Sequence, residues 1–197
     1  TRERADLLAS ESAVGSRYAP LLEDIPIPIG KENVLRALTD AFPEEAHFHA
    51  HLGRFYGLEG RYLESQQALE KALRLNENEN DSTLHHMLGM ANRYQVNDLI
   101  AKRSPLQDVA AAKKASAAFE KSRSQNPDNE HGFISEIQLL ARALDYAVKQ
   151  TGKTVASLTS DPATDPYLRE ALDRAEYLLA QVRLIRQGER PSNYELD

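Results

Sequence analysis

The chain has 197 residues, of which 41% are hydrophobic and 27% are charged, as in a typical globular protein. Its formal net charge of −6 argues against nucleic acid as a partner, because nonspecific binding to phosphates requires a basic surface. The absence of cysteine excludes disulfide bonds and thiolate zinc sites and fits a reducing cytoplasm. No apolar run approaches the ~20 residues that a membrane-spanning helix needs. We therefore expect a cytoplasmic protein without a membrane contact. Because the chain begins with Thr1, we expect it to be a piece of a longer protein.

The first 30 residues predict a separate N-terminal part. A modestly amphipathic helix is expected over residues 3–18. Pro26 and Pro28 in "IPIPIG", residues 25–30, then predict a stiff connector, because proline removes backbone donors and restricts the residue before it. A short helix after Gly30 is expected to place Val34, Leu35 and Leu38 on one face.

The remaining sequence, residues 31–190, predicts a single all-α domain of antiparallel helix pairs. The expected pairs are 44–57 with 61–75, a long helix from Asp81 or Ser82 with 106–125, and 130–150 with a long C-terminal helix over 165–187. These pairs define repeat 1 (about 44–78), repeat 2 (about 80–128) and a divergent third pair (about 130–187), and residues 191–197 form a tail. "TGKT", residues 151–154, resembles the end of a phosphate-binding loop, but it lacks the required earlier glycine and preceding strand, so we expect an ordinary loop.

An internal repeat supports this organisation. The pair Leu52-Gly53 recurs as Leu88-Gly89, 36 residues later, and Leu69-Glu70-Lys71 corresponds to Phe119-Glu120-Lys121. Glycine allows two helices to approach closely, and the larger residues around it fill the space between them. Each pair buries only part of its apolar surface and therefore requires a neighbouring pair.

These residues resemble the tetratricopeptide-repeat family, which implies pairs stacked into a right-handed solenoid. The matching positions are Leu52, Gly53, Tyr56, Tyr62, Leu69 and Ala72 in the first copy and Leu88, Gly89, Ala115, Phe119 and Pro127 in the second. The sequence departs from the family pattern at Ser65, where a small alanine is usual, and at His49, where a large residue is frequent. About fourteen extra residues between Gly89 and Phe119 predict longer helices in the second copy.

A narrower resemblance concerns residues 42–90. The run "FPEEAHFHAHLGRFYGLEGRYLESQQALEKALRLN" followed by "DSTLHHMLGM" resembles the C-terminal repeats of STAND-class signalling NTPases. In that group the repeats recognise a partner, and an attached NTPase module oligomerises. The resemblance thus implies a sensor module whose catalytic parts lie outside this sequence.

The histidines of "HFHAHLGRFY", residues 47–56, raise the alternative of a metal site. His47 and His51 have the i, i+4 spacing of zinc ligands, and His85 or His86 could supply a third. His49 lies on a different helix face and no HExxH motif is present, so we favour a packed His49 and no bound metal. The sequence orders no nucleophile, base and orienting group, and we predict no catalytic residue and no cofactor.

The resemblance places the first helix of each pair on the concave side of the solenoid. The helix phase then predicts a partner-binding surface of polar, exposed groups, formed by His47, His51, Arg54, His86, Met90, Arg93 and Asn97. Arginines on it would bind carboxylates or carbonyls. We therefore expect a non-enzymatic interaction module that binds a peptide or protein. The alternatives are a structural or self-associating module, in which the first and last helices contact another copy, and a metal-dependent enzyme built on the histidines.

Overall fold

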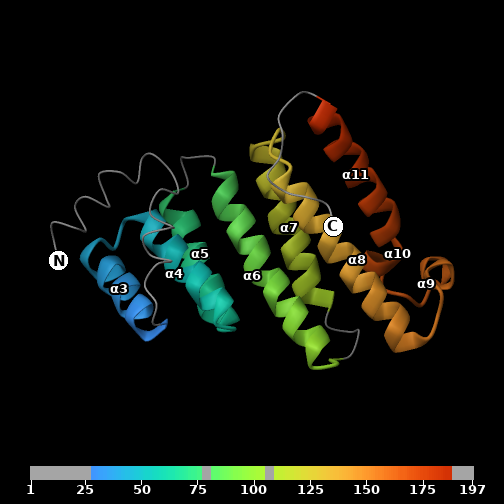
Figure 1. The fold of residues 1–197 in the computed structure, drawn as a ribbon, viewed down its shortest axis with the longest axis horizontal. Helices are drawn as coiled ribbons and strands as arrows, with labels where there is room; N and C mark the ends of the chain where they lie inside the picture. The colour runs from blue at the N-terminus through green and yellow to red at the C-terminus, as the bar shows by residue number, and fades with distance from the viewer. Residues whose placement is uncertain (1–27, 77–80, 105–108, 188–197) are drawn as a thin grey trace. The chain divides into compact units, whose positions relative to one another are not determined.

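The computed structural model describes residues 28–76, 81–104 and 109–187, and the regular structure in these ranges is entirely α-helical (Figure 1). The predicted helix over 3–18 and the tail from residue 191 lie outside the described residues. The chain divides into two compact units, Thr1–Asn80 (unit 1) and Asp81–Asp197 (unit 2). The prediction of an all-α protein of sequential antiparallel helix pairs is confirmed, and each unit is described by itself below.

Unit 1 contains α3 (Pro28–Ala41), α4 (Ala46–Leu58) and α5 (Tyr62–Leu75). The predicted pair 44–57 and 61–75 is confirmed by α4 and α5. The predicted connector is wrong at its end, because Pro28 begins α3; proline is tolerated in the first turn, where its missing N–H has no intrahelical acceptor. Val34 is 40% exposed, so it does not share the buried face of Leu35 and Leu38.

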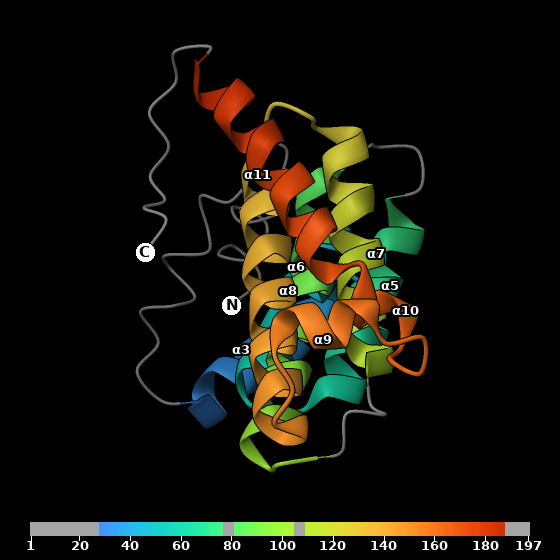
Figure 2. The ribbon, with the colours of Figure 1, turned by 90° about the vertical axis from the view of Figure 1, so that its right-hand side faces the viewer.

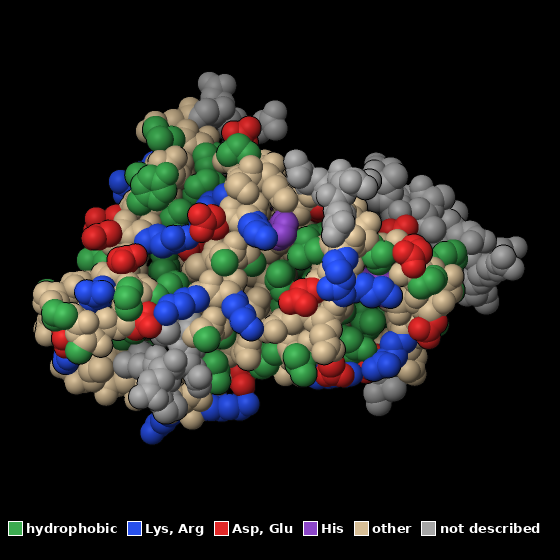
Figure 3. Space-filling model, turned by 180° about the vertical axis from the view of Figure 1, so that it is seen from behind, with side chains coloured by type: hydrophobic (Ala, Val, Ile, Leu, Met, Phe, Trp, Pro, Cys, Tyr) green, Lys and Arg blue, Asp and Glu red, His purple; other side chains and the backbone are tan. Residues whose placement is uncertain are grey.

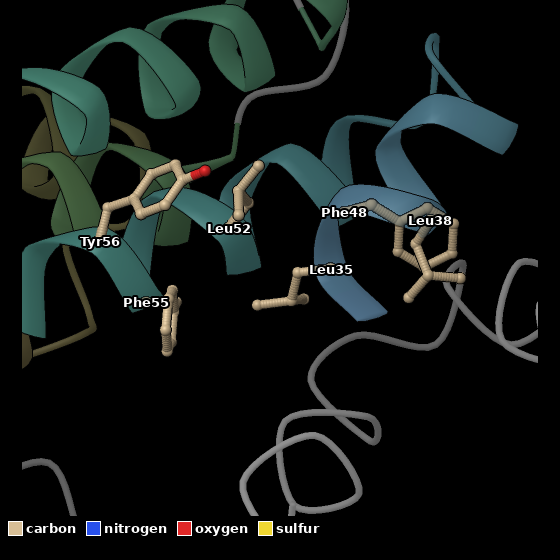
Figure 4. Close-up of a cluster of buried hydrophobic side chains, with 6 residues drawn as sticks. All are labelled: Leu35, Leu38, Phe48, Leu52, Phe55 and Tyr56. Atoms are coloured by element: carbon tan, nitrogen blue, oxygen red, sulfur yellow. The ribbon is translucent and has the colours of Figure 1, made fainter. Parts of the chain in front are cut away.

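One hydrophobic cluster of unit 1 lies between α3 and α4. Leu35 and Leu38 of α3 are buried together with four side chains of α4, namely Phe48, Leu52, Phe55 and Tyr56 (Figure 4). The i, i+3 and i, i+4 spacing of these residues places them on one face of each helix. The helix before the first repeat is therefore an integral part of its hydrophobic core.

Unit 2 begins with a second helix pair, α6 (Ser82–Ala101) and α7 (Val109–Gln125). The Asp81 carboxylate accepts hydrogen bonds from the backbone N–H groups of Thr83 and Leu84, at 2.8 and 3.2 Å, and caps α6 as its sequence position predicts. With 20 and 17 residues, these helices are longer than α4 and α5, with 13 and 14. The prediction that the extra residues lengthen the second pair is confirmed.

The third pair consists of α8 (His131–Thr151) and α11 (Ala171–Gln187). Between them, α9 (Val155–Ser160) and α10 (Pro166–Arg169) lie at one end of the pair (Figure 2). The predicted helix over 165–187 is thus two helices that meet at Glu170. In "TGKT", Gly152 ends α8 with a φ of 66°, and the Thr154 hydroxyl accepts a hydrogen bond from the Ser157 N–H at the start of α9, so this segment is a helix-to-helix turn.

Three apolar clusters lie among the described residues of unit 2, and one of them joins α8 to the short helices α9 and α10. The other two join the helix pairs. Phe119 of α7 packs with Val96 of α6 and Leu139 of α8, along with three alanines of α7. Phe133, Ile134 and Leu140 of α8 pack against Ala171, Leu178 and Val182 of α11. Because α8 contributes to both clusters, the third pair stacks directly on the second.

Candidate protein-interaction surface

The repeat glycines lie where two helices of a pair are closest. A Cβ atom added to Gly53 of α4 would lie 2.6 Å from Leu69 Cγ of α5, and one added to Gly89 of α6 would lie 2.4 Å from Phe119 Cε1 of α7. Leu69 and Phe119 are therefore equivalent, as the internal repeat predicts. Neither glycine can be replaced without moving its neighbour.

Most of the repeat-defining side chains contribute to the interior. Leu52, Tyr56, Leu69, Ala72, Ala115 and Phe119 are buried, Tyr62 and Leu88 are half-buried, and Pro127 is exposed in the turn between α7 and α8. Ser65 is fully buried, and its hydroxyl donates a 2.6 Å hydrogen bond to the Gly53 carbonyl oxygen. This bond explains how a polar residue replaces the usual alanine, since a buried hydroxyl needs a partner.

The histidines of α4 are paired within the protein. His49 is buried, and its Nε2 lies 2.9 Å from the Pro43 carbonyl oxygen, to which it can donate. The prediction that His49 packs is confirmed. His47 and His51 lie with their Nε2 atoms 2.9 Å apart, so one donates and the other accepts. His51 is only 6% exposed, and the prediction that it lies on an exposed surface is wrong.

Burial also sets the charge state of His51. Desolvation is the largest cause that lowers its pKa, to about 3, and the positive charges of His47, Arg54 and Lys31 act in the same direction. Lys31 belongs to α3, which packs against α4. Among the described residues, no group of three or more His, Cys, Asp or Glu side chains could hold a metal ion. Of the predicted residues of unit 1, Arg54 is exposed and His47 is half-buried.

The four predicted residues of α6 form one row in unit 2. His86, Met90, Arg93 and Asn97 are spaced by four, three and four residues, and all are half-buried. His86 Nε2 lies 3.0 Å from the Ser135 hydroxyl oxygen of α8. Further along, Arg93 donates a 2.8 Å hydrogen bond to the Gln138 side-chain oxygen. The structure therefore brings this row against α8.

The α8 side of this contact is a second polar row. Ser135, Gln138 and Arg142 follow at spacings of three and four residues, and Gln138 and Arg142 are exposed. The two rows together define the α6–α8 face, which consists of His86, Met90, Arg93, Asn97, Ser135, Gln138 and Arg142. The α8 row was missing from the predicted surface, because the third pair carries no repeat signature that would align it with the first two.

Within the α6–α8 face, His86 is the most enclosed titratable group. Its pKa is lowered to about 4, mainly by desolvation and to a smaller extent by the positive charges of His131 and Arg93. Its ring also packs against Phe119, with ring centroids 5.6 Å apart. At neutral pH a neutral His86 therefore links α6, α7 and α8, and the more exposed Arg142 supplies positive charge at the surface.

A buried ionic cluster, which sequence analysis missed, fixes the helices behind this face. Glu136 of α8 is completely buried and pairs with Arg123 of α7 and with Arg174 of α11, whose Nε lies 2.6 Å from a Glu136 carboxylate oxygen. Arg123 also donates to the Gly132 carbonyl oxygen at 3.2 Å. Glu136 lies three residues after Phe133 and four before Leu140, so its position on the apolar face of α8 was the available signal.

Surface charge is mixed rather than concentrated. Lys and Arg side chains are interspersed with Asp and Glu side chains on the face of the molecule drawn in Figure 3. Several basic residues of unit 2 are ion-paired, including Lys102 with Asp98 at 2.6 Å and Lys113 with Asp165 at 3.0 Å. Within the described ranges, no helix combines the length and the apolar character needed to cross a membrane.

The fold and the α6–α8 face define an all-α protein of sequential antiparallel helix pairs with a polar face between two of its helices. No protein-family model matches the chain, and no curated protein matches it.

Proposed function

We propose that this chain is a non-enzymatic protein-interaction module that binds a peptide or protein segment along the α6–α8 face. We further propose that its helix pairs continue as a tetratricopeptide-like right-handed solenoid within a larger signalling or defence protein. The repeat signature and the resemblance to STAND-class repeats support this wider setting.

The observation that carries the proposal is the meeting of α6 and α8, the first helices of two successive pairs. His86 contacts Ser135 and Arg93 contacts Gln138, so two polar rows adjoin over about two turns of α6. In the resembling family this side of a helix stack forms the concave surface. An elongated surface lined by side-chain donors and acceptors suits an extended or helical peptide segment.

The charge of the α6–α8 face indicates the chemistry of the partner. Arg93 and Arg142 lie on it, and Arg142 is exposed. A guanidinium group forms charge-assisted, often bidentate hydrogen bonds with carboxylates, and it also binds backbone carbonyls. We therefore propose a partner segment that carries acidic side chains.

Selection from a random peptide library tests this function, with the full chain as bait. Retained peptides should be enriched in Asp and Glu, and Arg93→Glu with Arg142→Glu should weaken their binding at least about tenfold, since each lost ionic contact in an interface costs on the order of 1 kcal/mol or more. Lys114→Glu, at an exposed position of α7 in the same unit, is the matched control and should leave binding unchanged.

Two results would count against the proposal. Peptides that bind the double variant as tightly as the unmodified chain would place the site elsewhere. Failure to retain any peptide family above background would remove the case for a peptide-binding module.

A further inference from the structure

The outward side of α11 carries large apolar side chains at the protein surface. Tyr177 and Leu184 are 64% and 61% exposed, and Ala180 between them is also exposed. Their spacings of three and four residues place them on one line along the helix, here called the outer stripe. The opposite side of α11 holds the buried Ala171, Leu178 and Val182. The helix therefore has two apolar faces, and only one of them is used within unit 2 among the described residues.

The shape of the outer stripe favours close approach of another helix. The small Ala180 lies at its middle, and a large side chain lies on either side of it. A small residue at the point of closest approach shortens the distance between two packed helices, and the larger residues fill the space beyond it. Hydrophobic side chains are visible over α11 in Figure 3.

Two charges flank one edge of the outer stripe. Glu176 and Arg183 are both exposed and are seven residues, or about two turns, apart on the same edge. In the described part of the chain neither forms an ion pair. Their order along α11, acid first and base second, means that an identical helix is complementary to it when it runs in the opposite direction.

We propose that a second copy of this chain covers the outer stripe, through antiparallel pairing of the two α11 helices about a twofold axis near Ala180. In this arrangement Tyr177 of one copy packs beside Leu184 of the other. Glu176 then lies beside Arg183 of the second copy, and the same pair repeats across the axis. In an antiparallel twofold pair the same edges of the two helices meet, and Glu176 and Arg183 both lie on that edge. A parallel twofold pair brings opposite edges together, so these two ion pairs would not form.

The small size of the surface favours a weak association. α11 has 17 residues and is therefore about 25 Å long. One pair of such helices buries less than the about 1,200 Å² of a typical stable interface. The dimer is thus weak and concentration-dependent, with a Kd on the order of 10–100 µM. It does not involve the α6–α8 face and is independent of the function proposed above.

Analytical ultracentrifugation of the full chain, from about 1 to 500 µM to bracket that Kd, tests the proposal. The chain should pass from monomer to dimer over this range, and Leu184→Asp should raise the Kd at least about tenfold. Leu63→Asp is the matched control, because Leu63 of α5 is 69% exposed and belongs to unit 1 rather than to α11. Circular dichroism should show that both variants keep the helix content of the unmodified chain, since both side chains lie at the surface.

Charge reversal then tests the orientation. Glu176→Arg and Arg183→Glu should each weaken the dimer about tenfold, because each creates like-charge contacts on both sides of the axis. The double variant should restore it, since both ion pairs form again with their signs exchanged. Cross-linking through introduced cysteines is a second test, because the chain itself contains none. Since Tyr177 lies beside Leu184 of the other copy, an equimolar mixture of Tyr177→Cys and Leu184→Cys chains should cross-link under oxidation more efficiently than Tyr177→Cys alone.

The proposal is overturned by a chain that stays monomeric over the whole range, or by a dimer that Leu184→Asp and Glu176→Arg leave unchanged. Efficient cross-linking of Tyr177→Cys to itself would overturn the antiparallel orientation. Assembly beyond the dimer would overturn a closed twofold pairing, because such growth requires a heterologous contact.

Discussion

Replacing Glu136 by glutamine should destabilise unit 2 more than any other single change of charge in it. The Glu136 carboxylate is fully buried, and it neutralises Arg123, whose side chain is only 10% exposed. Glutamine keeps the size of the side chain but removes the negative charge, so it leaves Arg123 as an uncompensated buried cation. Breaking a buried ion pair in this way typically costs about 3–5 kcal/mol.

The second arginine contributes less to this loss. The Arg174 side chain is 37% exposed and also lies 3.3 Å from the Glu120 carboxylate, so water and Glu120 can replace part of what Glu136 supplies. We therefore expect a total of about 3–5 kcal/mol, a large fraction of the 5–15 kcal/mol that stabilises a typical domain. Glu120→Gln is the matched control, because the Glu120 side chain is 65% exposed and surface pairs contribute only about 0–1 kcal/mol.

Hydrogen exchange measured by mass spectrometry is the suitable assay, because it reports on each unit separately. Glu136→Gln should accelerate exchange in peptides from α7, α8 and α11, while peptides from α4 and α5 serve as an internal reference. The combined variant Arg123→Met with Glu136→Met should recover much of the loss, since apolar residues often replace a buried pair without cost. A loss below about 1 kcal/mol, equal to that of the exposed-pair control, would refute the assignment of Glu136 as a buried ionic centre.

Three further changes test other parts of the structure. Gly89→Ala should lower the free energy of unfolding of unit 2 by about 1–3 kcal/mol, because the added Cβ would lie 2.4 Å from Phe119 Cε1. Urea unfolding should show that adding Phe119→Leu recovers part of this loss. Asp81→Ala should cost about 1 kcal/mol of unit 2 stability in the same assay by removing the α6 cap, whereas Asp81→Asn should cost less. Lowering the pH from 7 to 5 should destabilise unit 1 by about 2 kcal/mol, because the pKa of His51 falls from 6.5 to about 3 on folding. As the pH drops below 6.5, the unfolded chain therefore binds more protons than the folded chain does. Hydrogen exchange in α4 peptides should accelerate as the pH is lowered, relative to the intrinsic exchange rate, and His51→Gln should reduce this pH dependence. An equally strong pH dependence in that variant would assign the effect to other groups.

The helix pairs could be predicted from sequence because local signals and packing signals agree. Asp81 is both a favourable capping residue and the observed cap of α6. The two Leu-Gly pairs predict where helices touch, and Gly53 and Gly89 do contact Leu69 and Phe119. Agreement between propensity, periodicity and contact is what makes such segments predictable.

The burial of His51 could not be predicted in the same way, because it depends on contact between elements. Its i, i+4 spacing from His47 suggests an exposed pair, but His51 is buried and lies between Phe48 and Phe55 on the side of α4 that packs on α3. The break at Glu170 was missed for a related reason. Pro166 and Asp165 start α10 within a pattern that continues the apolar spacing of α11, so periodicity alone joins the two helices.

The repeat register shows which predicted residues can belong to one binding surface. The offset of 36 residues that relates Gly53 to Gly89 also relates Arg54 to Met90, a member of the α6–α8 face. The same offset takes His51 to Met87, which lies outside the row formed by His86, Met90, Arg93 and Asn97. The sequence-based surface therefore combined two helix phases. By this register Arg54 is the residue of α4 equivalent to this row. If α4 binds peptide through the equivalent face of its own repeat, Arg54→Glu should weaken that binding where His51→Gln does not. Equal effects of these two substitutions in the peptide assay would contradict a common register for the two repeats.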